Sequence, residues 1–256
     1  MTLYTDKRLY DAVAVGRDNG AFTVLLGGRP LRTPEKNILR LPTAALAAGV
    51  ANEWLAQGET LRSEAMPLTR LAATAAERVS VRRRAVVDAV VGYARSDLLC
   101  YRADSPDDLV ALQRRSWQPL LDWAAERLGA QLAVAAGVVP IEQPTTAIDA
   151  LRRAVDQATN LELAALSCVV QASGSIVVGL AILDGRIDAE TATATALLDE
   201  QYQAERWGID AEAERRRRDI AADIRAAASF LSLAGPRRFR ALSPGANELA
   251  DERSHG

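Results

Sequence analysis

The feature that most constrains the fold is an uncharged segment between Glu162 and Asp184. A membrane-spanning helix needs about 20 apolar residues, so this segment is long enough to cross a bilayer. However, Ser173-Gly174-Ser175 lies near its middle. Polar residues are costly in lipid, and glycine is a weak helix former. The segment therefore predicts two buried helices that meet at this tripeptide, and we expect no contact with a membrane.

Size and charge narrow the class of protein. A chain of 256 residues with 49% hydrophobic residues can bury a sizeable core in one domain or two. The net charge of −2 gives no reason to expect a polyanionic partner. Cys100 and Cys168 lie far apart, which indicates a reducing compartment and not a disulfide framework. We see no secretory or organellar signal at the amino terminus, so we expect a cytoplasmic protein.

Residues 8–42 predict a small antiparallel β meander. Apolar residues alternate in two runs around Asn19-Gly20, the strongest short signal for a hairpin turn. Gly27-Gly28 predicts the next turn, and residues 31–33 and 38–41 predict two further strands. Thr43 is a suitable N-cap for a helix that runs through Gln57 and ends at Gly58, and this helix can cover the sheet. The predicted unit is a two-layer domain over residues 1–65.

The rest of the chain predicts helices. Apolar stripes at helical spacing recur from Met66 onward, which indicates a larger helical domain over residues 66–235 and a frayed tail over 236–256. Residues 105–108 (Ser-Pro-Asp-Asp) predict a helix start, with Ser105 as the cap, and Pro119 is expected to break or kink that helix. The fold class is therefore α+β, with an N-terminal meander and covering helix before an all-helical domain.

The stretch from Asp184 to Leu233 carries the most distinctive pattern. Asp188 can cap a long helix that ends at Gly208 in the left-handed conformation, and Asp210 can cap a second helix. On the first helix a carboxylate, an amide and an indole share one face, which is unusual for plain core. The members of this face are Glu200, Gln203, Ala204 and Trp207. Trp207 is equally compatible with the core and with a binding anchor.

Catalytic motifs are absent from the sequence. The only histidine is His255, so a Ser–His or Cys–His pair within the fold is excluded, and no cluster of metal ligands or phosphate-binding loop is present. We expect no enzymatic activity, cofactor or metal. Two alternatives stay open: a helical enzyme that uses paired carboxylates, and a nucleic-acid-binding module that uses the arginine runs 82–84 and 215–218. Acidic neighbours make solvated helix faces the preferred interpretation of these runs.

Several motifs then carry a resemblance to a known family. They are Gly28-Arg29-Pro30-Leu31-Arg32-Thr33-Pro34, Glu53-Trp54-x-x-Gln57-Gly58, Met66-Pro67-Leu68-Thr69-Arg70-Leu71, and Asp199-Glu200-Gln201 followed by Trp207-Gly208-x-Asp210-x-Glu212. In this order they resemble the assembly chaperone of the F-type ATP synthase head that is dedicated to the α subunit, and the chain is similar to bacterial members.

The resemblance implies a chaperone without enzymatic activity. Such chaperones bind the unassembled α subunit through the surface that it later presents to the β subunit, shield it from aggregation, and release it for assembly of the α/β hexamer. The resemblance places Glu200 at the family's functionally sensitive acidic position, with Asp199 as the alternative if the register is shifted by one. Gln203 and Trp207 share the face of Glu200, so we include them in the expected client-binding set. The expected signature residues are Gly28, Arg29, Glu53, Trp54 and Pro67. We expect a monomer that binds no nucleic acid.

Overall fold

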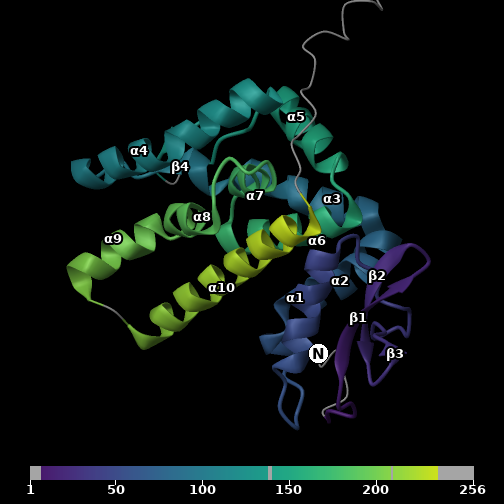
Figure 1. The fold of residues 1–256 in the computed structure, drawn as a ribbon. Helices are drawn as coiled ribbons and strands as arrows, with labels where there is room; N and C mark the ends of the chain where they lie inside the picture. Colours follow the sequence, from purple (N-terminus) through teal and green to yellow (C-terminus); the bar gives the residue numbers. More distant parts are fainter. Residues whose placement is uncertain (1–6, 138–139, 209, 236–256) are drawn as a thin grey trace, which may run out of the picture.

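The computed structural model describes residues 7–137, 140–208 and 210–235 of the chain (Figure 1). Its amino-terminal part is a three-stranded antiparallel sheet in the order β1-β2-β3. The strands are β1 (Val13–Asp18), β2 (Ala21–Leu26) and β3 (Arg29–Pro30). Both predicted turns are confirmed, because Asn19-Gly20 and Gly27-Gly28 all adopt positive φ, from 48° to 81°. These values match the tight hairpin turns that the twist of the strands favours.

The two further strands expected at 31–33 and 38–41 are wrong. The structure has only isolated bridges there, between Arg32 and Ile38 and between Phe22 and Leu41. The intervening loop folds on itself, because Lys36 adopts a φ of 68° and the Thr33 hydroxyl accepts a hydrogen bond from the Asn37 amide at 3.2 Å. Because this loop is held by its own hydrogen bonds, too few of its residues are extended to form a β-ladder with a neighbouring strand.

Helix α1 (Ala44–Leu55) covers the sheet as predicted. The Thr43 hydroxyl accepts the Leu46 amide at 3.0 Å, which confirms this residue as the N-cap. The helix ends before the predicted Gln57. The buried Gln57 side chain donates to the Glu53 carbonyl at 3.1 Å and accepts the Arg62 amide at 2.8 Å. These bonds turn the chain away from the helix axis.

Beyond α1 the structure is mainly helical, as predicted. The elements in chain order are η1 (Ser63–Ala65), α2 (Pro67–Thr74), the π-helical turn η2 (Ala75–Val79), α3 (Ser80–Gly92), η3 (Tyr93–Ser96), η4 (Leu98–Cys100), β4 (Tyr101–Arg102), α4 (Asp107–Trp123), the π-helical turn η5 (Ala124–Leu128), β5 (Ala135–Ala136), α5 (Thr145–Asp156), α6 (Asn160–Ser173), α7 (Ile176–Leu183), α8 (Ala189–Ala196), α9 (Leu198–Trp207) and α10 (Ala211–Ala234). Short strands β4 and β5 form one parallel pair, so the prediction that this part is all-helical is wrong at these residues. The fold is α+β, as the sequence indicates.

The uncharged segment forms two buried helices, α6 and α7, as predicted. Gly174 separates them with a φ of 70°, and the Ser175 hydroxyl caps α7 by accepting the Val178 amide at 3.1 Å. The helices approach closely at Gly179, where an added Cβ would lie 2.7 Å from a methyl group of Val170. Every residue of α7 is buried. Among the described residues, no helix combines the length and the apolar character that a membrane crossing requires.

Helix α10 joins the parts of the molecule. Its carboxyl-terminal half packs on α6, α8, α2 and α1, and Ile224, Ala227 and Phe230 are fully buried there. The Thr43 hydroxyl also donates to the Leu233 carbonyl at 2.5 Å. One hydrophobic cluster extends from the sheet to the helices. The boundary at residue 65 therefore stays a proposal, and the predicted tail over 236–256 lies outside the described residues.

The long helix expected over residues 188–207 is wrong, because the structure has two helices, α8 and α9. They divide at Leu197, whose ψ of 12° is not helical. The Thr195 carbonyl accepts a hydrogen bond from the Trp117 indole at 3.1 Å, and this bond replaces the helical bond to residue 199. Asp188 caps α8 and Asp210 caps α10, as predicted. Gly208 ends α9 with φ 89° and ψ 173°, which is not the predicted left-handed helical conformation.

The region of α4 needs two further corrections. The N-cap is Pro106 and not Ser105, although Asp107 and Asp108 occupy the first turn as expected. Helix α4 continues through Pro119, so a break is wrong. Pro119 removes one N–H donor to the Arg115 carbonyl, but both residues lie on the exposed side of the helix. Water can therefore satisfy that carbonyl.

Candidate functional site

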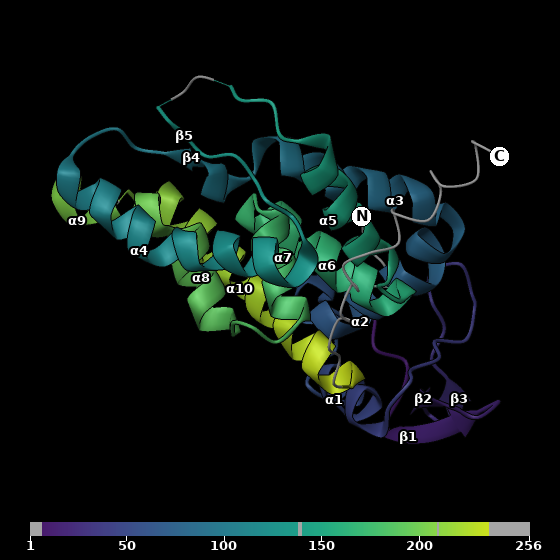
Figure 2. The same cartoon turned by 90° about the horizontal axis from the view of Figure 1, so that it is seen from above.

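Helices α9 and α10 meet in an arm at the end of the molecule opposite the sheet (Figures 1 and 2). The predicted face of α9 and the first turns of α10 line one surface groove, which we call the arm groove. Its lining residues are Glu200, Gln203, Ala204, Trp207, Gly208, Asp210, Glu212, Ala213, Arg216 and Arg217. The structure thus brings together Glu200, Gln203 and Trp207, three of the four residues predicted to bind a client.

Glu200 lies in the first turn of α9, where the positive end of the helix dipole favours a carboxylate. It forms an ion pair with Arg216 of α10, and the side-chain exposures are 34% for Glu200 and 65% for Arg216. The Oε1 atom of Glu200 accepts the arginine hydrogen bond. Among the described residues, the other carboxylate oxygen makes no hydrogen bond. The groove therefore presents a carboxylate that is held in place and still has an acceptor position.

Asp199 lies on a different side of α9. Its Oδ1 atom accepts a hydrogen bond at 2.7 Å from Nε2 of Gln113, a buried residue of α4. The Gln113 Oε1 atom in turn accepts the Ala103 amide at 2.8 Å. Asp199 therefore joins α9 to α4 and to the loop after β4, and it does not line the arm groove.

A second polar cluster fixes the same two helices. Asp108, in the first turn of α4, accepts a hydrogen bond from the Tyr202 hydroxyl at 2.7 Å and forms an ion pair with Arg206. The Arg206 guanidinium also lies 4.4 Å from the centre of the Tyr202 ring. The hydrogen bond from Tyr202 is the largest of the effects that lower the pKa of Asp108. This cluster was not predicted, because Asp108 lies more than 90 residues from Tyr202 and Arg206 in the sequence.

Trp207 is 76% exposed, so the core alternative for this residue is wrong. Large hydrophobic residues at this level of exposure are few among the described residues. Gln203 is also exposed one turn earlier on α9. An indole at the rim of a groove, beside a carboxylate and an amide, is typical of a surface that another protein covers.

The predicted signature residue Glu53 connects α1 to α2. Its carboxylate accepts the Leu68 amide at 2.6 Å, the Thr69 amide at 2.8 Å and the Thr69 hydroxyl at 2.7 Å. These groups belong to the first turn of α2, so a side chain from another helix caps it. Pro67 begins α2 at a position where proline is favourable. Burial is the largest influence on the carboxylate and raises the pKa of Glu53.

The other signature residues lie in or against the sheet. Trp54 is 2% exposed and its carbonyl accepts the Tyr10 hydroxyl at 2.7 Å, so this signature residue belongs to the core. The rings of Tyr10 and Trp54 meet edge to face, with centroids 5.7 Å apart. Gly28 forms the turn before β3, and Arg29 begins that strand opposite Leu26. The two motifs around residues 28 and 53 are thus parts of one packed unit.

A buried carboxylate outside the predicted set also organises the helical part. Asp97 is fully buried and accepts hydrogen bonds from the Leu99 amide, the Ser175 hydroxyl and the Val177 amide at 2.8–3.2 Å. It therefore caps η4 and α7 together. Burial is the main cause that raises the pKa of Asp97 to about 6, and the hydrogen bonds oppose this shift.

The structure also shows the surroundings of potential metal ligands and of the two arginine runs. In residues 7–137, 140–208 and 210–235, no group of three or more His, Cys, Asp or Glu side chains is arranged to hold a metal ion. In the run 215–218, Arg216 pairs with Glu200 and Arg217 pairs with Glu214. Arg83 donates to the Asn160 side chain and to the carbonyls of residues 156 and 158. One member of the run 82–84 and two members of the run 215–218 are thus engaged within the fold.

An α+β fold with an open polar and aromatic groove defines a candidate binding protein. Comparisons with known proteins identify the family to which this binding protein belongs. The sequence profile of the ATP12 chaperone protein family matches residues 7–125. The mitochondrial protein atp12 of Schizosaccharomyces pombe is 27% identical over 214 residues, which cover 79% of this chain and 74% of that protein.

Solved structures agree with this match. The crystal structure of Atp12 from Paracoccus denitrificans is 43% identical, with a TM-score of 0.85 and coverage of 90% of this chain and 99% of the other. A lysine-for-aspartate mutant of the same protein is 42% identical, with a TM-score of 0.85 and coverage of 91% and 100%. The chain therefore belongs to the ATP12 chaperone family, the assembly chaperones of the ATP synthase.

Proposed function

We propose that this chaperone binds the unassembled α subunit of the ATP synthase through the arm groove. The bound chaperone shields the surface that the α subunit later presents to the β subunit, and the β subunit then displaces it. The observation that carries this proposal is the arrangement of Trp207 and Glu200 in one groove at the end of the molecule.

The energetic reasoning begins with Trp207. Tryptophan is enriched among the residues that dominate protein interfaces, and truncation of such a residue typically costs about 2 kcal/mol or more of affinity. The exposed indole loses its contact with water when a client covers it. Glu200 contributes specificity, since its second carboxylate oxygen can accept a hydrogen bond from an N–H group of the client. Arg216 holds the Glu200 side chain in place for this contact.

The need for such a protein follows from the client. A subunit of a ring exposes a large apolar interface before its neighbour arrives, and such surfaces aggregate. A chaperone that covers the interface in equal stoichiometry prevents aggregation without ATP, because the final partner competes for the same surface. Within this proposal the chain needs no catalytic group and no cofactor.

The enzyme and nucleic-acid alternatives gain no support from the site. A carboxylate enzyme needs a converging acid pair, but Asp199 bonds to α4 while Glu200 faces α10. A nucleic-acid module needs a continuous basic face, whereas Glu200 and Glu214 pair with two arginines of the run 215–218. We therefore propose no second function.

The test is co-purification of the tagged chain with the α subunit of its own host, together with light scattering of newly diluted α subunit. We expect a stable complex with the α subunit, suppressed scattering, and release when the β subunit is added. Trp207→Ala should weaken the complex while Val81→Ala should not, because both side chains are 76% exposed but only Trp207 lines the groove. An α subunit that is not retained by the wild-type chain would overturn the proposal.

A further inference from the structure

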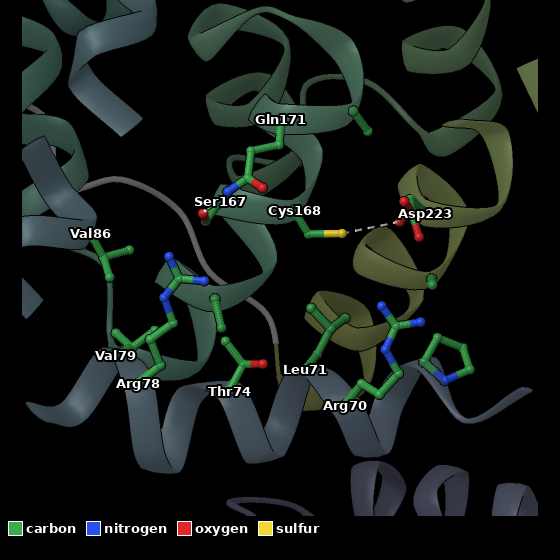
Figure 3. A pocket seen from close by; sticks show the side chains of 14 residues that line it. Arg70, Leu71, Thr74, Arg78, Val79, Val86, Ser167, Cys168, Gln171 and Asp223 are labelled. Carbon is green, nitrogen blue, oxygen red and sulfur yellow. Dashed lines mark hydrogen bonds between the residues drawn. The ribbon is translucent and has the colours of Figure 1, made fainter. Parts of the chain in front are cut away.

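A second pocket lies where α2, η2, α6 and α10 meet (Figure 3). We call it the body pocket, and it shares no residue with the arm groove. Its floor is apolar and includes the buried side chains of Leu71, Val79, Val86 and Ala164. The pocket exists because α6 and α10 contribute short side chains, among them Ala164, Cys168 and Ala226. Short side chains at a helix junction leave space that longer ones would fill.

The wall opposite α6 has an unusual backbone. Residues 75–79 form a π-helical turn, which inserts extra backbone into the run from α2 to α3. Such turns frequently occur at functional sites, since they change the direction in which the following side chains point. Arg78 belongs to this turn, and Arg70 precedes it on α2.

The two arginines give the pocket its electrostatic character. Among the described residues, neither Arg70 nor Arg78 makes a hydrogen bond or an ion pair, and both side chains line the pocket (Figure 3). Eight residues of helix separate them by about 12 Å along the axis. Asp223 on the α10 wall is the one acidic residue of the lining, and the charge of Arg70 also acts on the Glu53 carboxylate outside it. The remaining polar groups are neutral.

The Cys168 thiol is one of these neutral groups. It is half-buried in the α6 wall, and it lies 3.9 Å from the Asp223 carbonyl. Burial first, and then the charge of Asp223, raise the pKa of Cys168 to about 11. The thiol is therefore protonated near neutral pH and leaves the positive charge of the pocket unchanged.

We propose that the body pocket is a second client site that receives a segment of the α subunit in which acidic side chains flank an apolar one. The apolar side chain lies on the floor formed by Leu71 and Val86, and the carboxylates pair with Arg70 and Arg78. This inference rests on the proposed function, since it names the same client. It adds a contact that is independent of Trp207 and Glu200.

The test compares affinities for the isolated α subunit. The double variant Arg70→Glu, Arg78→Glu should weaken binding at least about tenfold, because exposed ion pairs contribute up to about fivefold each and reversal adds repulsion. The matched control is Arg82→Glu, Arg153→Glu, which makes the same charge change on exposed arginines outside both sites. The control should bind as the wild type does. The difference should shrink in high salt.

A photo-crosslinking residue at Gln171 provides a readout that does not depend on the variants folding. Gln171 is exposed at the pocket and should crosslink to a peptide of the α subunit that contains Asp or Glu beside an apolar residue. Binding by the double variant that equals the control, or a crosslinked peptide without acidic residues, overturns the inference. If Glu200→Lys loses the client while the double variant keeps it, only this inference fails. If the wild-type chain does not bind the α subunit, both proposals fail.

Discussion

Glu200→Lys tests the arm groove most directly, and the structure sets its magnitude. The substitution removes the ion pair with Arg216, in which Glu200 is 34% exposed. A partly exposed pair contributes up to about 1 kcal/mol, so we expect the variant to be destabilised by about 1 kcal/mol. For a chain of this length this corresponds to a drop in Tm of roughly 2–4 °C. The variant should therefore remain folded.

The effect on binding should be larger. Loss of one partner in a desolvated charged contact typically costs about 2–5 kcal/mol of affinity, which is about 30-fold or more. We therefore expect Glu200→Lys to abolish protection of newly made α subunit, and Glu200→Gln to weaken it less. The assay pairs a melting curve for each variant with titration of the isolated α subunit.

A charge swap separates recognition from local structure. In the double variant Glu200→Arg, Arg216→Glu, the ion pair between α9 and α10 forms again with its polarity reversed. If the client recognises the carboxylate of Glu200, the swap restores the Tm and leaves binding impaired. Restored binding would show that Glu200 acts only by holding α9 to α10. A folded Glu200→Lys variant that still protects the client would refute the reasoning altogether.

Three further predictions concern residues that hold the fold. Glu53→Ala leaves three donors at the start of α2 without their acceptor and should lower the free energy of unfolding by roughly 2–4 kcal/mol, measured by urea denaturation; an unchanged midpoint would contradict this role. Trp54→Arg places an unpaired charge where the indole is 2% exposed, and should give aggregated or unfolded protein, as judged by size-exclusion chromatography; a variant that melts like the wild type would contradict a core role for Trp54. The pKa of Asp97 rises to about 6 in the folded state from an ordinary value of 3.8. The folded protein therefore binds the carboxyl proton of Asp97 more tightly than the unfolded protein does. Asp97 therefore adds to the free energy of unfolding below about pH 4, and this contribution of about 3 kcal/mol is lost as the pH rises to about 6. The wild type should lose stability relative to Asp97→Asn over this pH range. A difference in stability that does not change with pH would disprove this prediction.

The fold was predictable where the local sequence decides the structure. Asn19-Gly20 specifies its turn, Thr43 and Asp188 specify their caps, and Gly174 divides the uncharged segment without reference to distant residues. The division between α8 and α9 was not predictable, because it depends on an indole of α4 that bonds to the Thr195 carbonyl. That contact spans 78 residues of sequence.

The site was predictable in part for the same reason. Spacing along α9 placed Glu200, Gln203 and Trp207 on one face, and the structure shows this face in a groove. Sequence spacing could not show that Arg216 pairs with Glu200, or that Asp199 bonds to Gln113. The adjacent acids 199 and 200 look interchangeable in sequence, but successive helical residues point about 100° apart and contact different helices.

The two halves of α10 are under different structural constraints. Truncation of Ile224 or Phe230 opens a cavity shared by several helices, and a larger side chain at Ala227 overpacks the same core, so few residues are acceptable there. Exposed groove residues of the first half that form no ion pair, such as Glu212 and Ala213, tolerate variation. Under the proposed function, a library randomised only at such positions should alter client preference while the rest of the helix preserves folding. One continuous helix would in this way keep the residues that set specificity apart from the residues that set stability.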